Sequence, residues 1–171
     1  MRGQLAGRAC AFAREPRESS FPFNRTQTTS DLMAYDDNNI FAKILRGELP
    51  CTKVCETDTT IAFMDIMPQS PGHVLIVPKE AAVMLYELSD EAAAECIRMS
   101  KRIALAIREA LQPDGLFVGQ FNGEAAGQTV PHVHFHLIPR WVTQPLGAHS
   151  REVADPAELT AMAERIRAAL K

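Results

Sequence analysis

The sequence predicts a single α+β domain built on an antiparallel sheet of about five strands, with one long helix and a short N-terminal helix. Short apolar segments with strand patterning predominate between residues 53 and 138, and short connections join them. Residues 90–111 instead repeat apolar side chains at helical spacing. One long helix among closely connected strands is typical of an antiparallel sheet with helices packed on one face.

Local signals predict each element in order. We expect a short helix after Asn38 or Asn39 that ends at Gly47, strands at 53–56, 59–65, 73–77, 116–121 and 132–138, the long helix at 90–111, and a C-terminal helix at 156–169. Ser89 is a favourable N-cap for the long helix, and the acidic residues that follow it suit the positive end of the helix dipole. Pro113 ends that helix because proline cannot continue it.

Length and composition fit one domain with a less regular segment on either side. The chain has 171 residues, of which 46% are hydrophobic, enough for one substantial core. Residues 1–32 are polar and Arg-rich without apolar periodicity, which predicts a disordered N-terminal extension. A transit peptide and a true start at Met33 are the alternatives. The folded domain is then expected at 33–140, and a C-terminal segment with a helix at 141–171.

Charge and cysteine content narrow the classes of partner. The formal net charge of −3 gives no strong attraction to nucleic acid or to an anionic membrane. No apolar run approaches the roughly 20 residues that span a bilayer. The four cysteines form no Cys-x-x-Cys pair, so we expect reduced thiols rather than a disulfide framework. These features predict a cytoplasmic protein with no nucleic-acid or membrane partner.

The segment PHVHFHLIPR, residues 131–140, carries the strongest functional signal. Histidines and apolar residues alternate strictly along it, in the order His132, Val133, His134, Phe135, His136 and Leu137. Because side chains of a strand alternate between its faces, the three imidazoles share one face, with neighbouring Cα atoms roughly 6.6 Å apart. Packing alone has no use for three imidazoles in a row, so the segment predicts a binding or catalytic site.

Two kinds of site fit this histidine face. Alternating histidines on a strand are good ligands for zinc or iron, and His73 or Asp65 could complete such a set. A phosphate site is the alternative, and the preceding loop favours it. Gly123 and Gly127 allow backbone N–H groups to approach an anion closely, and residues 128–129 add neutral hydrogen-bonding groups.

Two separate blocks resemble the histidine-triad (HIT) family, in particular its bacterial-type members. Residues 127–138, GQTVPHVHFHLI, are similar to the family signature His-x-His-x-His followed by two apolar residues. Residues 62–79, AFMDIMPQSPGHVLIVPK, resemble the hairpin that precedes it, and residues 39–49 resemble the N-terminal helix. The resemblance covers about residues 38–140 and implies a HIT-like fold.

The resemblance also implies a role for each polar residue of the site. The middle histidine, His134, corresponds to the nucleophile that forms a covalent nucleotidyl intermediate. His136 and His73 match histidines that contact the phosphate, while His132 supports the geometry of the site. Asp65 matches the acidic residue that accepts hydrogen bonds from the ribose hydroxyls.

The remaining site residues are expected to hold the nucleotide. The positions matched to the α-phosphate or leaving group are Asn122, Gln128 and Thr129, and those matched to the base pocket are Ile40, Phe41, Phe63 and Ile66. Some relatives carry a Cys-x-x-Cys that helps to bind a structural zinc. Asn39 and Ala42 occupy the matching positions here, so we expect neither that zinc nor another metal or cofactor.

The implied function is hydrolysis or transfer at the α-phosphate of a purine (AMP-type) nucleotide conjugate by a homodimer that pairs through the long helix and extends the sheet. The substrate branch stays open between a nucleoside phosphoramidate and a dinucleoside polyphosphate. A non-catalytic nucleotide-binding regulatory protein and a zinc metalloenzyme that uses the three-histidine strand are the competing hypotheses.

Overall fold

The computed structural model describes residues 35–144 and 152–171. Its elements are α1 (Ile40–Leu45), β1 (Lys53–Glu56), β2 (Thr60–Met64), β3 (Val74–Pro78), the 3-10 turn η1 (Leu85–Glu87), α2 (Asp90–Leu111), β4 (Gly115–Gln120), η2 (Glu124–Ala126), β5 (Phe135–Arg140) and α3 (Pro156–Ala168). The predicted α+β class is confirmed, and so are the limits of the long helix. The expected disordered extension at 1–32 lies outside the described residues.

The strands form one antiparallel sheet in the order β1-β2-β3-β5-β4. Strand β2 pairs with β3 along its whole length, from Thr60 opposite Pro78 to Met64 opposite Val74. Strand β5 is inserted between β3 and β4, so the histidine segment enters the middle of the sheet rather than its edge. The predicted sheet of about five strands is therefore confirmed.

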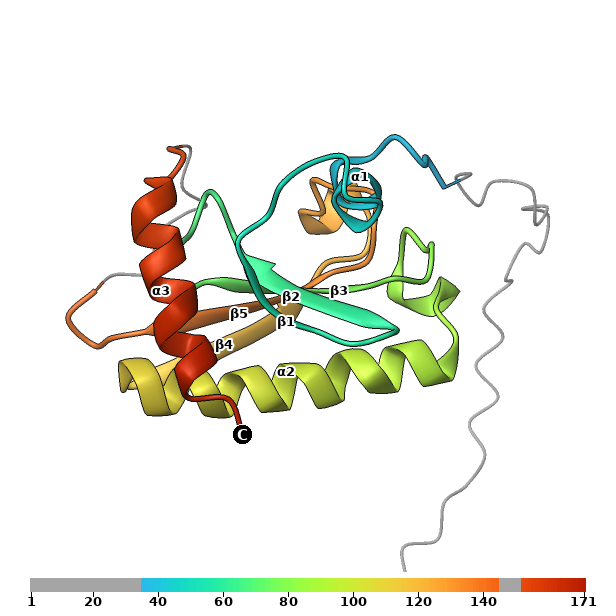
Figure 1. The fold of residues 1–171 in the computed structure, drawn as a ribbon. Helices are drawn as coiled ribbons and strands as arrows, with labels where there is room; N and C mark the ends of the chain where they lie inside the picture. Colours follow the sequence, from blue (N-terminus) through green and yellow to red (C-terminus); the bar gives the residue numbers. More distant parts are fainter. Residues whose placement is uncertain (1–34, 145–151) are drawn as a thin grey trace, which may run out of the picture. The chain divides into compact units, whose positions relative to one another are not determined.

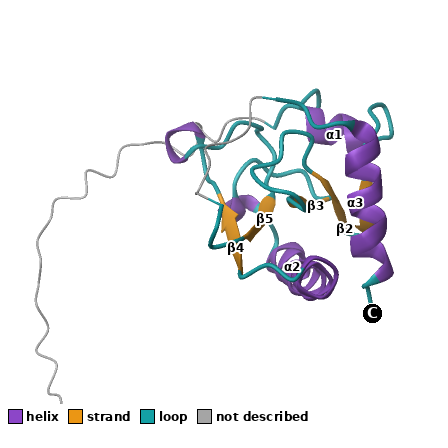
Figure 2. Ribbon diagram, turned by 90° about the vertical axis from the view of Figure 1, so that its left-hand side faces the viewer, coloured by secondary structure: helices purple, strands orange, loops and turns teal. Residues whose placement is uncertain are grey.

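Helices cover both faces of the sheet, although the sequence predicted only one covered face. On one face α2 and α3 bury a core with the side chains of Ile76 and Leu137. On the other face Phe41 of α1 packs against Phe63 and Leu75. Figures 1 and 2 show α1 and α2 on opposite sides of the strands. The expectation was wrong for α1 because β2 and β3 are buried on both faces, and such strands need cover twice.

The long helix α2 begins where its cap predicts. The Ser89 side chain accepts a hydrogen bond from the Ala92 N–H, and Asp90 and Glu91 occupy the first turn. Its buried face carries Cys96 and other apolar residues that lie against the sheet. Ile97 is 55% exposed. Helical spacing of apolar residues alone therefore does not place Ile97 in the core, since the face toward the sheet runs through Cys96, Ile103 and Ile107.

The histidine segment differs from its prediction in one respect. The regular strand begins at Phe135, not at His132. The ladder with β3 ends at the Ile76–Phe135 pair because the Val133 N–H donates to Ala82 O in the loop that follows β3. The alternation of faces is kept nevertheless, since Val133, Phe135 and Leu137 all reach the core.

No helix in the described part of the chain is long and apolar enough to cross a membrane.

Candidate active site

A cavity of about 310 Å³ lies between α1, the end of β2 and the histidine segment. Its apolar wall includes Ile40, Phe41, Ile44, Leu49, Phe63, Ile66 and Leu75, and its polar wall is made of Asp65, Thr129, His134 and His136. The volume falls at the lower end of the range for small-molecule sites. An apolar wall opposite carboxyl and imidazole groups suits a ligand with a flat apolar part and an anionic part.

The His134 side chain is held in one tautomer. Its Nδ1 atom lies 2.7 Å from the backbone carbonyl oxygen of His132. Because a carbonyl oxygen only accepts, Nδ1 carries the proton, and the lone pair of the neutral ring is on Nε2. The Phe41 ring packs edge-on against this imidazole, with centroids 5.0 Å apart. His134 thus has the tautomer that a nitrogen nucleophile needs.

His132 is fully buried and serves the structure rather than the cavity. Its Nε2 atom lies 2.9 Å from Pro78 O, and its Nδ1 atom lies 2.5 Å from the Tyr35 hydroxyl. Burial lowers the pKa of His132 to about 4, so the ring is neutral at ordinary pH. His132 does not line the cavity.

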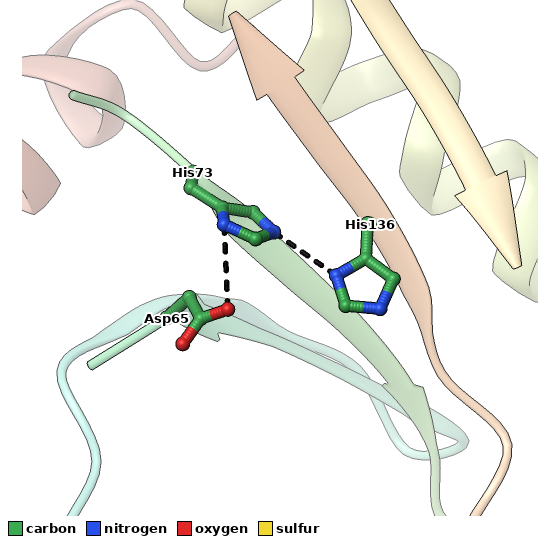
Figure 3. A group of neighbouring side chains, drawn as sticks. All are labelled: Asp65, His73 and His136. Carbon is green, nitrogen blue, oxygen red and sulfur yellow. Dashed lines mark hydrogen bonds and ion pairs between the residues drawn. The ribbon is translucent and has the colours of Figure 1, made fainter. Parts of the chain in front are cut away.

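Asp65, His73 and His136 form a chain of polar contacts from the end of β2 across β3 to β5 (Figure 3). His73 Nδ1 lies 3.3 Å from Asp65 Oδ2, and His73 Nε2 lies 3.0 Å from His136 Nδ1. The Gln69 N–H donates to His73 Nδ1 at 3.2 Å.

The proton on His73 Nε2 determines what His136 offers to a ligand. If Nδ1 of His73 accepts from Gln69, the ring proton is on Nε2; if His73 is charged, both nitrogens carry protons. In these two states His73 Nε2 donates to His136 Nδ1, and the His136 proton is on Nε2, next to His134, whose ring centroid is 4.8 Å away. A neutral His73 with its proton on Nδ1, facing Asp65, would instead accept from His136 Nδ1.

Three of these side chains could also hold a metal ion. Within the described residues, Asp65, His73 and His136 form the group whose ligand atoms come close enough to consider, all within 4.8 Å of one another. Asp65 and His136, however, contact opposite nitrogens of His73. A bound ion would use one nitrogen of His73 and would replace the contact made at that nitrogen. The choice between a metal and an anion at this group is tested by the metal content of the purified protein.

The glycine loop before the histidines is fixed by two amide side chains. Gln128 Oε1 accepts from the Gly123 N–H at 2.7 Å, and Gln128 Nε2 donates to Val83 O at 2.7 Å. Asn122 Oδ1 accepts from the Leu85 N–H at 2.7 Å. Neither amide lines the cavity, whereas Thr129 does. The contacts of Asn122 and Gln128 with a phosphate stay predictions.

The HIT domain profile matches residues 46–142, which is more than half of the chain. The chain belongs to the HIT family.

Relatives of this HIT protein cover most of its length. It is 39% identical to adenosine 5'-monophosphoramidase hnt1 of Schizosaccharomyces pombe over 142 residues, which span 77% of this chain and 98% of the relative. A crystal structure of a Hit-like protein from Bartonella henselae matches with a TM-score of 0.75 and 46% identity, over 80% and 100% of the two chains. A Zn-bound histidine triad family protein from Mycobacterium smegmatis matches with a TM-score of 0.69 and 32% identity, over 77% and 92%.

Most of the residues predicted from the HIT signature lie together around the cavity. The eight that line it are Ile40, Phe41, Phe63, Asp65, Ile66, Thr129, His134 and His136. His73 touches it through His136, and His132 through the carbonyl that holds His134. Asn39 and Ala42 offer no thiolate for a metal: the Asn39 side chain caps α1, and Ala42 is buried.

Sequence reasoning missed several residues that shape the HIT site. Leu49, Pro50 and Cys51 line the cavity from the loop after α1, which has no periodic pattern. Tyr35 reaches His132 from outside both signature blocks. Its aromatic ring in a polar stretch was the one available signal, and no spacing rule connects the two residues.

Proposed function

We propose that this protein hydrolyses the bond between the α-phosphate of AMP and an amine leaving group, through a covalent intermediate on His134. One observation carries the proposal: the His134 Nδ1–H donates to His132 O at 2.7 Å, so the lone pair is on Nε2 in a ring that lines the cavity. The adenosine 5'-monophosphoramidase activity named for the yeast relative supports the choice of substrate class.

The first step is a displacement at phosphorus. His134 Nε2 attacks the α-phosphorus, a P–N bond to the imidazole forms, and the P–N bond to the leaving amine breaks. His136 gives its Nε2 proton to the amine while its Nδ1 takes the Nε2 proton of a charged His73, so neither ring becomes an anion. His73 supports His136 through its own hydrogen bond and compensates charge at the phosphate together with it.

The second step releases the nucleotide. Water attacks the α-phosphorus, the bond to His134 breaks, and AMP leaves. His136 takes up the proton of the attacking water on Nε2 and returns its Nδ1 proton to His73 Nε2, which restores the starting state. Neither step requires a metal or cofactor in this scheme.

The two walls of the cavity suit the two ends of AMP. Asp65 lies at the border between them, where its carboxylate would accept hydrogen bonds from the ribose hydroxyls. Phe41 and Phe63 are buried members of the apolar wall, while Ile40 and Ile66 are 43% and 45% exposed at its rim. An apolar wall of this kind prefers the larger purine face without reading its edge, so adenine is preferred rather than required.

The test compares AMP release from adenosine 5'-phosphoramidate and from diadenosine polyphosphates, with wild type and His134→Ala. We expect the variant to be slower by on the order of 10³–10⁶-fold, while AMP binding measured by calorimetry persists. Rapid quenching with labelled substrate should trap adenylyl-His134 in the wild type alone. Preference for the polyphosphate would place the protein in the dinucleoside polyphosphate branch instead.

Two outcomes would favour the competing functions. AMP binding without turnover of either substrate would indicate a non-catalytic nucleotide-binding protein. One stoichiometric metal in protein purified without added zinc, lost in His134→Ala, would indicate a metalloenzyme.

We also propose that two copies pair along β4 and α2 and that the protein resides in the reducing cytoplasm. Edge strand β4 exposes Phe117 and Val118, and α2 exposes Leu105, at 46%, 49% and 50%. Val118→Lys should shift the mass in light scattering from dimer to monomer, and Val153→Lys, at another exposed apolar position, should not.

The buried free thiol of Cys96 supports a reducing location.

A further inference from the structure

We propose that Tyr35 is a positioning residue for the nucleophile: its hydroxyl fixes the His132 ring, and the His132 carbonyl in turn fixes the tautomer of His134. The Tyr35 hydroxyl oxygen lies 2.5 Å from His132 Nδ1. The catalytic part of this inference rests on the function proposed above, whereas the hydrogen-bond chain can be measured without it.

The direction of each hydrogen bond follows from its partners. Pro78 O only accepts, so His132 Nε2 must be the nitrogen that carries the proton. The Nδ1 atom of the neutral ring is then an acceptor, and the Tyr35 hydroxyl is the donor. Burial raises the pKa of Tyr35 and lowers that of His132, so both groups stay neutral and this direction holds across ordinary pH.

The Tyr35 hydroxyl holds the His132 ring on the side where its other neighbours are aromatic rings. The Tyr35 ring meets His132 edge-on with centroids 5.4 Å apart, and Phe41 meets it edge-on at 6.3 Å. Ring faces and edges tolerate rotation of an imidazole, whereas two hydrogen bonds to opposite nitrogens define its plane. Tyr35 and Pro78 together therefore fix one orientation of His132.

His132 passes this restraint to the nucleophile. Its backbone carbonyl accepts the Nδ1–H of His134, and the Phe41 ring packs against both imidazoles. The peptide that carries this carbonyl lies before the regular part of β5 and is held by one backbone bond, from the Val133 N–H to Ala82 O at 2.9 Å. The orientation of the His132 ring, set by Tyr35 and Pro78, is the second restraint on the carbonyl that sets the His134 tautomer.

The contact joins two distant parts of the chain. Tyr35 and His132 are 97 positions apart, and Tyr35 lies before α1, outside the HIT match at 46–142. Segment 35–39 is itself anchored, since the Asn39 side chain donates to Asp36 O at 2.8 Å. Tyr35 thus has a defined position from which to act.

The test is Tyr35→Phe, which keeps the ring and removes only the hydroxyl. The chain has two tyrosines, and Tyr86→Phe is the matched control because Tyr86 is 70% exposed and contacts the Met84 sulfur. We expect Tyr35→Phe to lower kcat about threefold to tenfold with KM nearly unchanged, the size of effect of one lost hydrogen bond. Tyr86→Phe should leave both constants unchanged.

Nitrogen chemical shifts of the imidazoles, measured by long-range proton–nitrogen NMR, provide the second readout. In Tyr35→Phe the His132 Nδ1 resonance should move toward that of an acceptor without a donor, and His134 should gain a population protonated on Nε2. Unchanged shifts at His132 or at His134 would overturn the proposal, and so would altered shifts with an unchanged kcat.

This readout also separates the proposal from the proposed function. If the wild type turns over no adenylyl substrate, the nucleotide hydrolase assignment fails. The shifts of His132 and His134 still decide whether Tyr35 positions the ring that lines the cavity.

Discussion

Replacement of Gly72 by alanine tests how tightly the turn before His73 is packed. Gly72 has a φ of +84°, in the left-handed region, and directly precedes the histidine that supports His136. A Cβ atom at this position would lie 2.3 Å from Leu111 Cδ1 and 3.2 Å from Pro139 Cγ. Leu111 would have to rotate, since the proline ring cannot.

The expected loss of stability in Gly72→Ala has three contributions. The left-handed backbone costs an L-residue about 1–2 kcal/mol, and displacing the Leu111 side chain from its rotamer costs about 0.5–1.5 kcal/mol. The smaller conformational entropy of the unfolded alanine chain returns about 0.4–1 kcal/mol. We therefore expect Gly72→Ala to lower the free energy of unfolding by about 2 kcal/mol.

Gly47→Ala is the matched control. Gly47 has a φ of +74°, and a Cβ atom added there would meet no other atom within 4 Å. Gly47→Ala carries only the backbone cost and the entropy gain, so we expect it to lower the free energy of unfolding by about 1 kcal/mol. The difference between the two variants isolates the contact with Leu111.

Urea denaturation of both variants measures these free energies, and a double-mutant cycle with Leu111→Ala measures the contact itself. Removal of the Leu111 side chain should make Gly72→Ala milder by about 1 kcal/mol. The reasoning is refuted if Gly72→Ala costs no more than Gly47→Ala, or if the Gly72 and Leu111 changes are additive.

Two further predictions concern α1 and the buried imidazole. Asn39→Ala removes the side chain that accepts from the N–H groups of Phe41 and Ala42, so it should cost about 1 kcal/mol and weaken AMP binding in calorimetry, whereas Asn39→Asp should keep the cap. His132 has a pKa of about 4 when folded and an ordinary value of 6.5, so as the pH falls the unfolded state binds the proton first. Stability in urea should thus decrease from pH 6.5 to 4, by about 3 kcal/mol, and a His132 resonance that titrates near 6.5 would contradict this.

Patterns within a few residues of one another determined much of this protein. Ser89 and Pro113 bound α2 because caps and helix breakers act on the adjacent backbone. The alternation of His134 and Phe135 assigned them to opposite faces because side chains of an extended chain alternate whatever it pairs with. The resemblance to the HIT signature matched His134 to the nucleophile, and the hydrogen bond at its Nδ1 leaves the lone pair on Nε2.

Contacts between segments far apart in the sequence determined the other features of the fold and of the site. The bond from Val133 to Ala82 starts β5 at Phe135, and packing on both faces of β2 and β3 places α1 opposite α2. The amide of Gln128 bonds the backbone of Val83 instead of lining the cavity. Tyr35 meets His132 from 97 positions away. No local propensity encodes such pairings, because each depends on which buried polar group lacks a partner once the whole chain has folded.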